Sequence, residues 1–120
     1  MDAEILKKRT KKFGLEVIKI VERLPNTKTA DVIGKQLVRS ATSVGANYRS
    51  ACRARSKKEF IAKARISIEE ADEAMYWMEL LTEAGFVPEP HLSPLHKEGN
   101  EIVAILTASV KTASQNLREK

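Results

Sequence analysis

The sequence contains few residues that break or cross-link a chain: five glycines, four prolines and one cysteine, Cys52, among 120 residues. A single cysteine excludes an intramolecular disulfide and a zinc site built from cysteines. No apolar run approaches the roughly 18 residues that a membrane-spanning helix needs, and the first residues lack the apolar segment of a secretory signal. We therefore expect the protein to stay in the cytoplasm.

Aromatic residues are also scarce, with six in the chain, and Tyr48 and Tyr76 are the ones expected to be exposed. Sequence-specific reading of single-stranded nucleic acid relies on aromatic stacking, so we do not expect it here. Glycine-rich phosphate loops, nucleophile elbows and complete metal-ligand sets are missing. We interpret His91 and His96 as surface residues of the connection between the third and fourth helices, and the acidic run from Glu69 to Glu73 as a solvated face. Neither enzymatic activity nor a cofactor is expected.

Apolar residues make up 42% of the chain and charged residues 31%, which is typical of a folded protein. The apolar residues recur at spacings of three and four, which predicts helices, and strand-like alternation is absent. The expected helices span residues 2–24, 29–55, 57–84 and 94–117. Their short connections predict one domain, 1–120, folded as an all-α, antiparallel, up-and-down four-helix bundle.

Capping residues mark most of the expected helix boundaries. Thr27 or Thr29 is placed to cap the second helix, and Ser56 has the capping-box spacing that opens the third. Gly85 is expected to end the third helix in a left-handed conformation. Ser93 followed by Pro94 predicts the N-cap and first residue of the fourth helix.

The second helix sorts its residues into three faces. The core face carries Ile33, Leu37, Ala41, Val44, Tyr48 and Ala51. A basic stripe carries Lys35, Arg39, Arg49 and Arg53, and continues at the corner with Arg55, Lys57 and Lys58. A third face is small and polar and includes Ser43 and Asn47. Small residues from 40 to 47 cost helix propensity, so the run is either simply a poor helix or a place where another helix backbone approaches closely. We favour the close approach, with the hydroxyls and Asn47 hydrogen-bonded across the contact.

Charge is segregated along the chain. Residues 35–65 hold nine basic side chains against Glu59 alone, whereas residues 66–83 hold six acidic side chains and no basic one. Residues 1–12 add five basic side chains against two acidic ones. Guanidinium groups suit bidentate contact with phosphate, so the basic stripe predicts a nucleic-acid-binding surface. Alternatively, the stripe is a solvated face or meets the acidic half of the third helix in a neighbouring subunit.

The third helix carries a second apolar stripe, with Ile66, Trp77 and Leu80, on the side nearly opposite its core face. A monomeric bundle would leave this stripe in water. We therefore expect a ring-like homo-oligomer whose interface uses the second stripe together with Ser43 and Asn47.

The residues also resemble a known family. The resemblance rests on L-P-x-T (24–27), V-I-G-x-Q-L-x-R-S (32–40), T-S-V-G-A-N-Y-R (42–49), C-R-A-R-S-x-x-x-F-I-A-K (52–63) and E-A-D-E-A-x-Y-W-x-E-L-L (70–81). These motifs strongly resemble the bacterial four-helix bundles labelled as 23S ribosomal RNA intervening-sequence proteins. The resemblance implies a ring of five subunits, and kinship to the accessory variability determinant of diversity-generating retroelements, a basic barrel thought to act through nucleic acid.

The sequence thus predicts a non-enzymatic homo-oligomer, expected to be a pentamer, that binds nucleic acid, with RNA favoured, through its basic surface. The alternative is an oligomeric scaffold or adaptor that binds an acidic protein partner and no nucleic acid. Sequence alone does not decide among RNA, DNA and protein, nor does it name the biological process.

Overall fold

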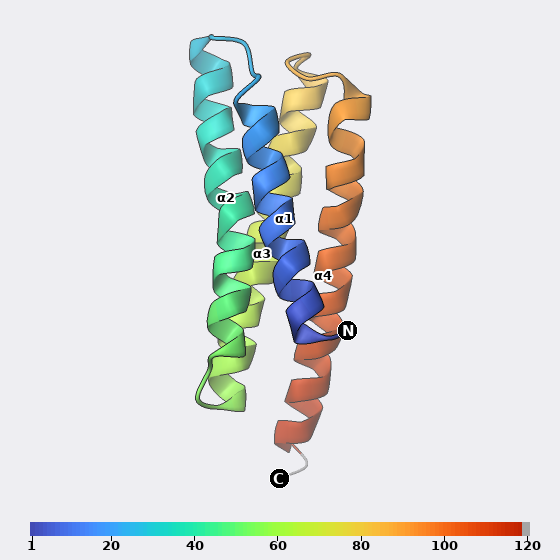
Figure 1. Cartoon of the computed structure of the whole chain (residues 1–120). Coiled ribbons are helices and arrows are strands. Elements are labelled where there is room, and N and C mark those ends of the chain that lie inside the picture. The colour runs from blue at the N-terminus through green and yellow to red at the C-terminus, as the bar shows by residue number, and fades with distance from the viewer. Residues whose placement is uncertain (119–120) are drawn as a thin grey trace.

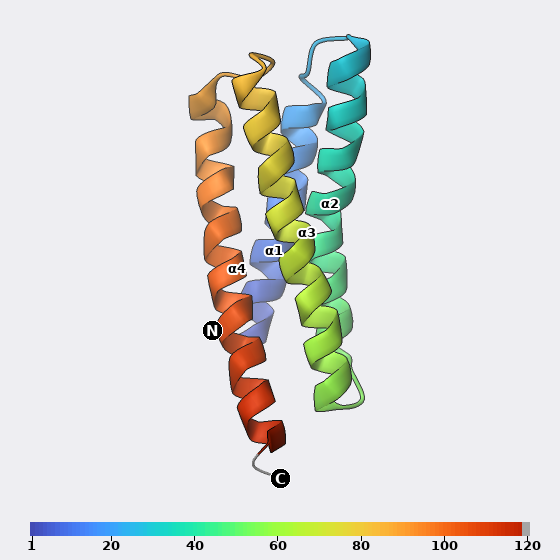
Figure 2. The same ribbon diagram turned by 180° about the vertical axis from the view of Figure 1, so that it is seen from behind.

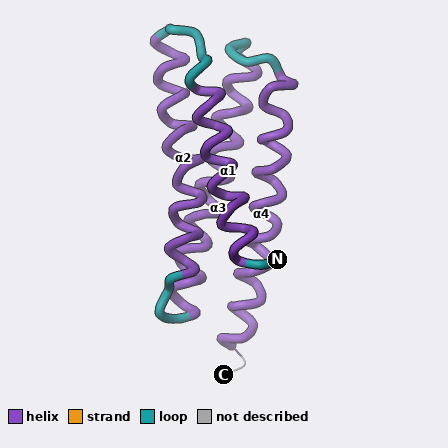
Figure 3. Tube along the Cα trace, viewed as in Figure 1, coloured by secondary structure: helices purple, strands orange, loops and turns teal. Residues whose placement is uncertain are grey.

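The computed structural model describes residues 1–118 and folds them into four α-helices without a strand (Figure 1). The helices are α1 (Ala3–Val21), α2 (Lys28–Cys52), α3 (Lys57–Glu83) and α4 (Glu89–Arg118). Figure 3 shows that short loops join them, so successive helices run in opposite directions. The predicted all-α, antiparallel, up-and-down arrangement is confirmed.

The bundle is elongated, with extents of 53 × 21 × 21 Å. Helix α1 packs against α2 and α4 and lies diagonally across the bundle from α3, which comes to the front when the view is reversed (Figure 2). Because α1 has 19 residues and α4 has 30, the N-terminus lies partway along α4. Across residues 1–118, no helix is long and apolar enough to cross a membrane.

The expected caps fix three helix boundaries. The Thr27 hydroxyl accepts a hydrogen bond from the Ala30 amide at 3.1 Å and begins α2, while Ser56 accepts from the Glu59 amide at 3.1 Å and begins α3. The Glu59 carboxylate accepts from the Arg55 amide at 3.3 Å, one residue earlier than in a standard capping box. Gly85 ends α3 with a φ of 82°, the left-handed conformation that favours glycine.

The predicted start of the fourth helix is wrong. Helix α4 begins at Glu89, so Ser93 is not a cap and Pro94 lies inside the helix. Leu92 explains the extension, because it is 2% exposed and anchors the first turn in the core. Pro94 has no backbone N–H, so α4 lacks the hydrogen bond to the Pro90 carbonyl in its first turn. The second helix also ends earlier than predicted, at Cys52.

The core runs along the bundle axis and uses the predicted face of α2. Leu37, Ala41 and Val44 are fully buried, and Ile33, near the start of α2, is half-buried. A smaller cluster lies at the end of the bundle that holds the α2–α3 loop, where α2, α3 and α4 extend past α1. It contains Ala51, Ile61, Ala64 and Val110. The four apolar seams therefore meet in the core, as the periodicity predicted.

The small residues of α2 allow α1 to approach closely, which confirms the predicted backbone contact. A Cβ atom on Gly45 would lie 3.3 Å from the carbonyl carbon and oxygen of Thr10. The predicted hydrogen bonds across this contact are wrong. The Ser43 hydroxyl donates to the Arg39 carbonyl and the Asn47 amide donates to the Ser43 carbonyl, both within α2. Helix hydroxyls commonly bond to the preceding turn in this way.

Candidate nucleic-acid interface

Two residues of the predicted basic stripe, Lys35 and Arg39, form ion pairs with carboxylates of the same chain. The Lys35 ammonium lies 3.2 Å from the Asp31 carboxylate one turn earlier. Arg39 reaches across to α3, where its guanidinium donates to Glu70 at 2.9 Å and also to Glu73. Arg39 therefore meets the acidic half of the third helix within its own chain, and a phosphate would have to displace two carboxylates to bind it.

The charges around Arg39 support one another. The hydrogen bond to Glu70 and then the one to Glu73 raise the pKa of Arg39. Burial raises the pKa of Glu73, but hydrogen bonds with Glu70 and Arg39 outweigh that effect, so the pKa of Glu73 is lowered overall. Both shifts favour the charged form of the side chain. The acidic run is thus partly an ion-pair site and not only a solvated face.

The rest of the predicted basic stripe, from Arg49 to Lys58, has no ion pair within residues 1–118. We call Arg49, Arg53, Arg55, Lys57 and Lys58 the corner cations, because they lie on the last turn of α2, the α2–α3 loop and the first turn of α3. All five are exposed. The corner cations form a basic surface at one end of the bundle.

Helix α1 adds basic residues that the sequence pattern did not assign to the site. Lys8 and Lys11 line a groove of about 390 Å³ between α1 and α2, together with Arg49. The excess of basic residues in 1–12 was the sequence signal for this contribution of α1. It did not show which face of the bundle α1 would cover, because that depends on packing.

The basic surface offers little aromatic area for stacking. Tyr48 is 5% exposed, which agrees with its place on the predicted core face of α2 but not with the expectation that its ring is exposed, and burial raises the pKa of its hydroxyl. Tyr76 is exposed, but it lies on α3 in a T-shaped contact with the Trp77 ring. Phe60 is half-buried at the corner and lines a shallow hollow with Arg55. Contacts to this surface are therefore dominated by charge.

The five residues predicted to form an oligomer interface differ in their exposure: four are half-buried and one is exposed. Ser43 and Asn47 are half-buried on α2, while Ile66 on α3 is 39% exposed. Trp77 and Leu80 are half-buried, and Trp77 packs against the core of its own chain. The exposed apolar area of α3 therefore comes from Ile66 and from Tyr76, which is 54% exposed.

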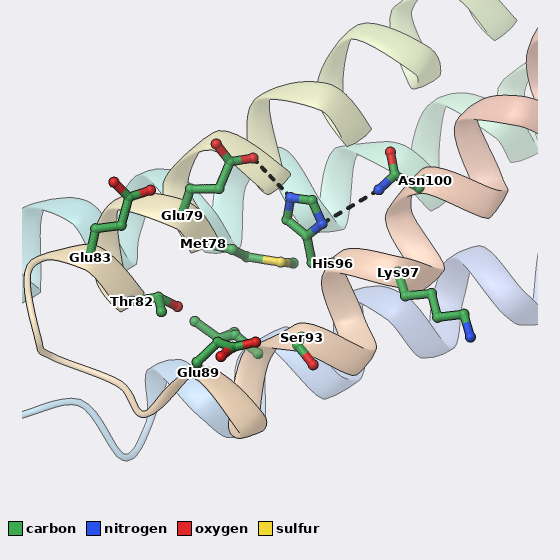
Figure 4. A pocket seen from close by; sticks show the side chains of 10 residues that line it. Met78, Glu79, Thr82, Glu83, Glu89, Ser93, His96, Lys97 and Asn100 are labelled. Atoms are coloured by element: carbon green, nitrogen blue, oxygen red, sulfur yellow. Dashed lines mark hydrogen bonds and ion pairs between the residues drawn. The ribbon is translucent and has the colours of Figure 1, made fainter.

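A second hollow, of about 330 Å³, lies between the end of α3 and the start of α4 (Figure 4). There the His96 Nε2 atom lies 2.8 Å from a Glu79 carboxylate oxygen, and Asn100 lies 3.5 Å from the other ring nitrogen. His96 is therefore a contact between helices and not a residue of a surface connection, which corrects the prediction, while His91 is exposed. Within the described residues, no three His, Cys, Asp or Glu side chains form a group that could hold a metal ion.

A family profile and a solved structure each match most of the chain. A family profile described as "23S rRNA-intervening sequence protein" matches residues 2–108. A crystal structure of a protein of unknown function from the S23 ribosomal protein family of Bacteroides thetaiotaomicron VPI-5482 is 32% identical, with a TM-score of 0.86. The match covers 92% of this chain and 99% of that one. A search of curated proteins found no match.

Proposed function

The chain belongs to the family of 23S rRNA-intervening sequence proteins, and from this membership and the corner cations we propose that it binds nucleic acid through backbone phosphates. The proposed form is a ring-like homo-oligomer, expected to be a pentamer, without catalytic activity. The family description refers to a sequence within 23S rRNA, and RNA is therefore the first ligand to test. The observation that carries the proposal is the cluster of five exposed cations at one corner.

Phosphate binding suits this corner for a physical reason. Clustered cations that lack carboxylate partners raise the local positive potential, and a phosphate backbone that displaces their counterions gains entropy. Several weak contacts repeated around a ring would act together on one strand. With little aromatic area present, affinity should depend weakly on base sequence.

Fluorescence anisotropy with unrelated RNA and DNA oligomers, measured from low to physiological salt, tests this proposal. Wild-type affinity is expected to fall steeply with salt and to vary little with sequence. The variant with Lys57→Glu and Lys58→Glu should bind more weakly, and its salt slope should fall by about 0.7–0.9 for each phosphate that the variant no longer neutralises. Both substitutions lie in the first turn of α3, where glutamate is compatible with the helix.

The matched control is Lys28→Glu with Lys111→Glu, which changes the net charge equally but lies outside the corner. It should retain most of the affinity. If the wild type does not bind at low salt, or if the corner variant keeps both affinity and slope, nucleic-acid binding is rejected. An oligomeric scaffold for an acidic protein partner would then be the function that the same charges support.

A further inference from the structure

A hollow of about 500 Å³ lies beside the corner cations, where the end of α2 meets the start of α3. The α2–α3 loop that borders it is at the bottom of the view in Figure 1. Its volume falls within the range of pockets that hold small ligands, about 300–1,000 Å³. We call it the corner hollow, and its lining includes Ala3, Tyr48, Cys52, Arg55, Lys57 and Phe60.

The wall of the corner hollow combines an aromatic ring with a buried hydroxyl. Phe60 is half-buried, so part of its side chain is accessible from the hollow. Tyr48 is 5% exposed, and among residues 1–118 the polar side chain that its hydroxyl meets is the Cys52 thiol, one turn later in α2. A thiol is a weak hydrogen-bond partner. A ligand that forms a stronger hydrogen bond with the Tyr48 hydroxyl would therefore bind favourably here.

The two sides of the corner hollow differ in charge. Arg55 and Lys57 are exposed on one side and have no ion pair among the described residues. The start of α1 forms the other side and carries Asp2 and Glu4, whose charges add to burial and to the thiol contact in raising the pKa of Tyr48. A phosphate is attracted to the first side and repelled by the second.

We propose that the corner hollow holds one unpaired base of a single-stranded nucleic acid, with the flanking phosphates on Arg55 and Lys57. The base stacks against Phe60 and hydrogen-bonds to the Tyr48 hydroxyl. Every base has an aromatic face, and a tyrosine hydroxyl both donates and accepts, so the hollow takes any base. Bases in a duplex are paired and stacked, and none can enter the hollow without leaving the stack.

This inference rests on the nucleic-acid binding of the proposed function and adds a preference for single strands. Charge alone favours the duplex, because a duplex carries more phosphates per unit length than a single strand. The ring and the cations also have separable effects. Loss of the Phe60 ring weakens single-strand binding at every salt concentration, whereas loss of Lys57 and Lys58 reduces the salt slope.

Fluorescence anisotropy with one unstructured RNA strand, alone and annealed to its complement, tests this inference. The wild type should bind the single strand more tightly than the duplex. Phe60→Leu keeps an apolar side chain against the small cluster at this end of the bundle but removes the ring. It should weaken single-strand binding about fivefold or more and leave duplex affinity and salt slope unchanged.

The matched control is Phe86→Leu, because Phe86 is also half-buried but lies in the loop after α3, at the other end of that helix. It should bind both forms of RNA as the wild type does. Tyr48→Phe is a second variant, which keeps the buried ring and removes only the hydroxyl. It should weaken single-strand binding about two- to tenfold and leave duplex binding unchanged. Circular dichroism must show that every variant remains helical.

The outcomes separate this inference from the proposed function. A wild type that binds neither form of RNA would reject both. A wild type that binds the duplex at least as tightly as the single strand would reject the base site alone. The inference also fails if Phe60→Leu and Tyr48→Phe, both helical, bind the single strand as the wild type does, or if Phe86→Leu weakens that binding equally.

Discussion

At the scale of single residues, Arg39 joins α2 to α3 by holding two carboxylates. Its side chain is 48% exposed, while those of Glu70 and Glu73 are 17% and 37% exposed. Such a partly exposed pair stabilises the fold modestly, because water and salt screen it. Its main consequence is to remove one cation and two anions from the surface available to partners.

The lowered pKa of Glu73 predicts a specific pH dependence. A carboxylate whose folded pKa lies below its ordinary value of 4.5 adds stability above that value, and the stability is lost as pH falls through the folded pKa. Glu73→Gln should lower the free energy of unfolding at pH 7 by less than about 1 kcal/mol. The difference from wild type should shrink as the pH is lowered to about 3, below the ordinary range of a glutamate.

Urea unfolding at both pH values measures this effect. The control Glu69→Gln removes an exposed carboxylate that has no ion pair among the described residues. It should not reproduce the pH-dependent difference. A Glu73→Gln penalty that is equally large at the lower pH would show that packing, and not the ion pair, is responsible.

At the scale of helices, the contact between α1 and α2 depends on small residues. Gly45 faces the backbone at Thr10, and Gly14 faces Thr42 of α2, with an added Cβ 3.5 Å from the Thr42 Cα. The backbone of α1 cannot move aside as a flexible side chain can. The poor helix propensity of residues 40–47 is therefore offset by packing.

Gly45→Leu is expected to lower the free energy of unfolding by about 1–3 kcal/mol, because the added side chain forces the two helices apart. Ala104→Leu places the same side chain on an exposed position of α4 and should change stability little. Urea unfolding of both variants makes the comparison. Equal stability of Gly45→Leu and wild type would show that α1 can shift without cost.

The sequence predicted all four helices, because each carries an apolar seam of helical period. It did not predict where α4 begins, since the burial of Leu92 is a tertiary effect that outweighs the Ser93–Pro94 signal. The site was predicted in part. The α2–α3 corner follows from local positions, whereas the pairing of Arg39 joins residues 31 and 34 positions apart. A helical wheel does not show which neighbour each face meets.

At the scale of the whole molecule, charge is unevenly distributed over the bundle. Among residues 1–118, the corner cations and Lys8 and Lys11 along the groove between α1 and α2 lack an ion pair, and so do Glu69 and Asp72 on the outer face of α3. The net charge of +5 conceals this uneven distribution. We propose that the cations without an ion pair at the corner serve contact with phosphates.

The ratio of absorbance at 260 nm to that at 280 nm tests the central claim most directly. The protein would be purified at low salt and measured before and after treatment with nuclease and high salt. We predict a raised ratio that falls after treatment, because host nucleic acid held by phosphate contacts is digested and displaced. A ratio that starts at the value of nucleic-acid-free protein and does not change would contradict the account.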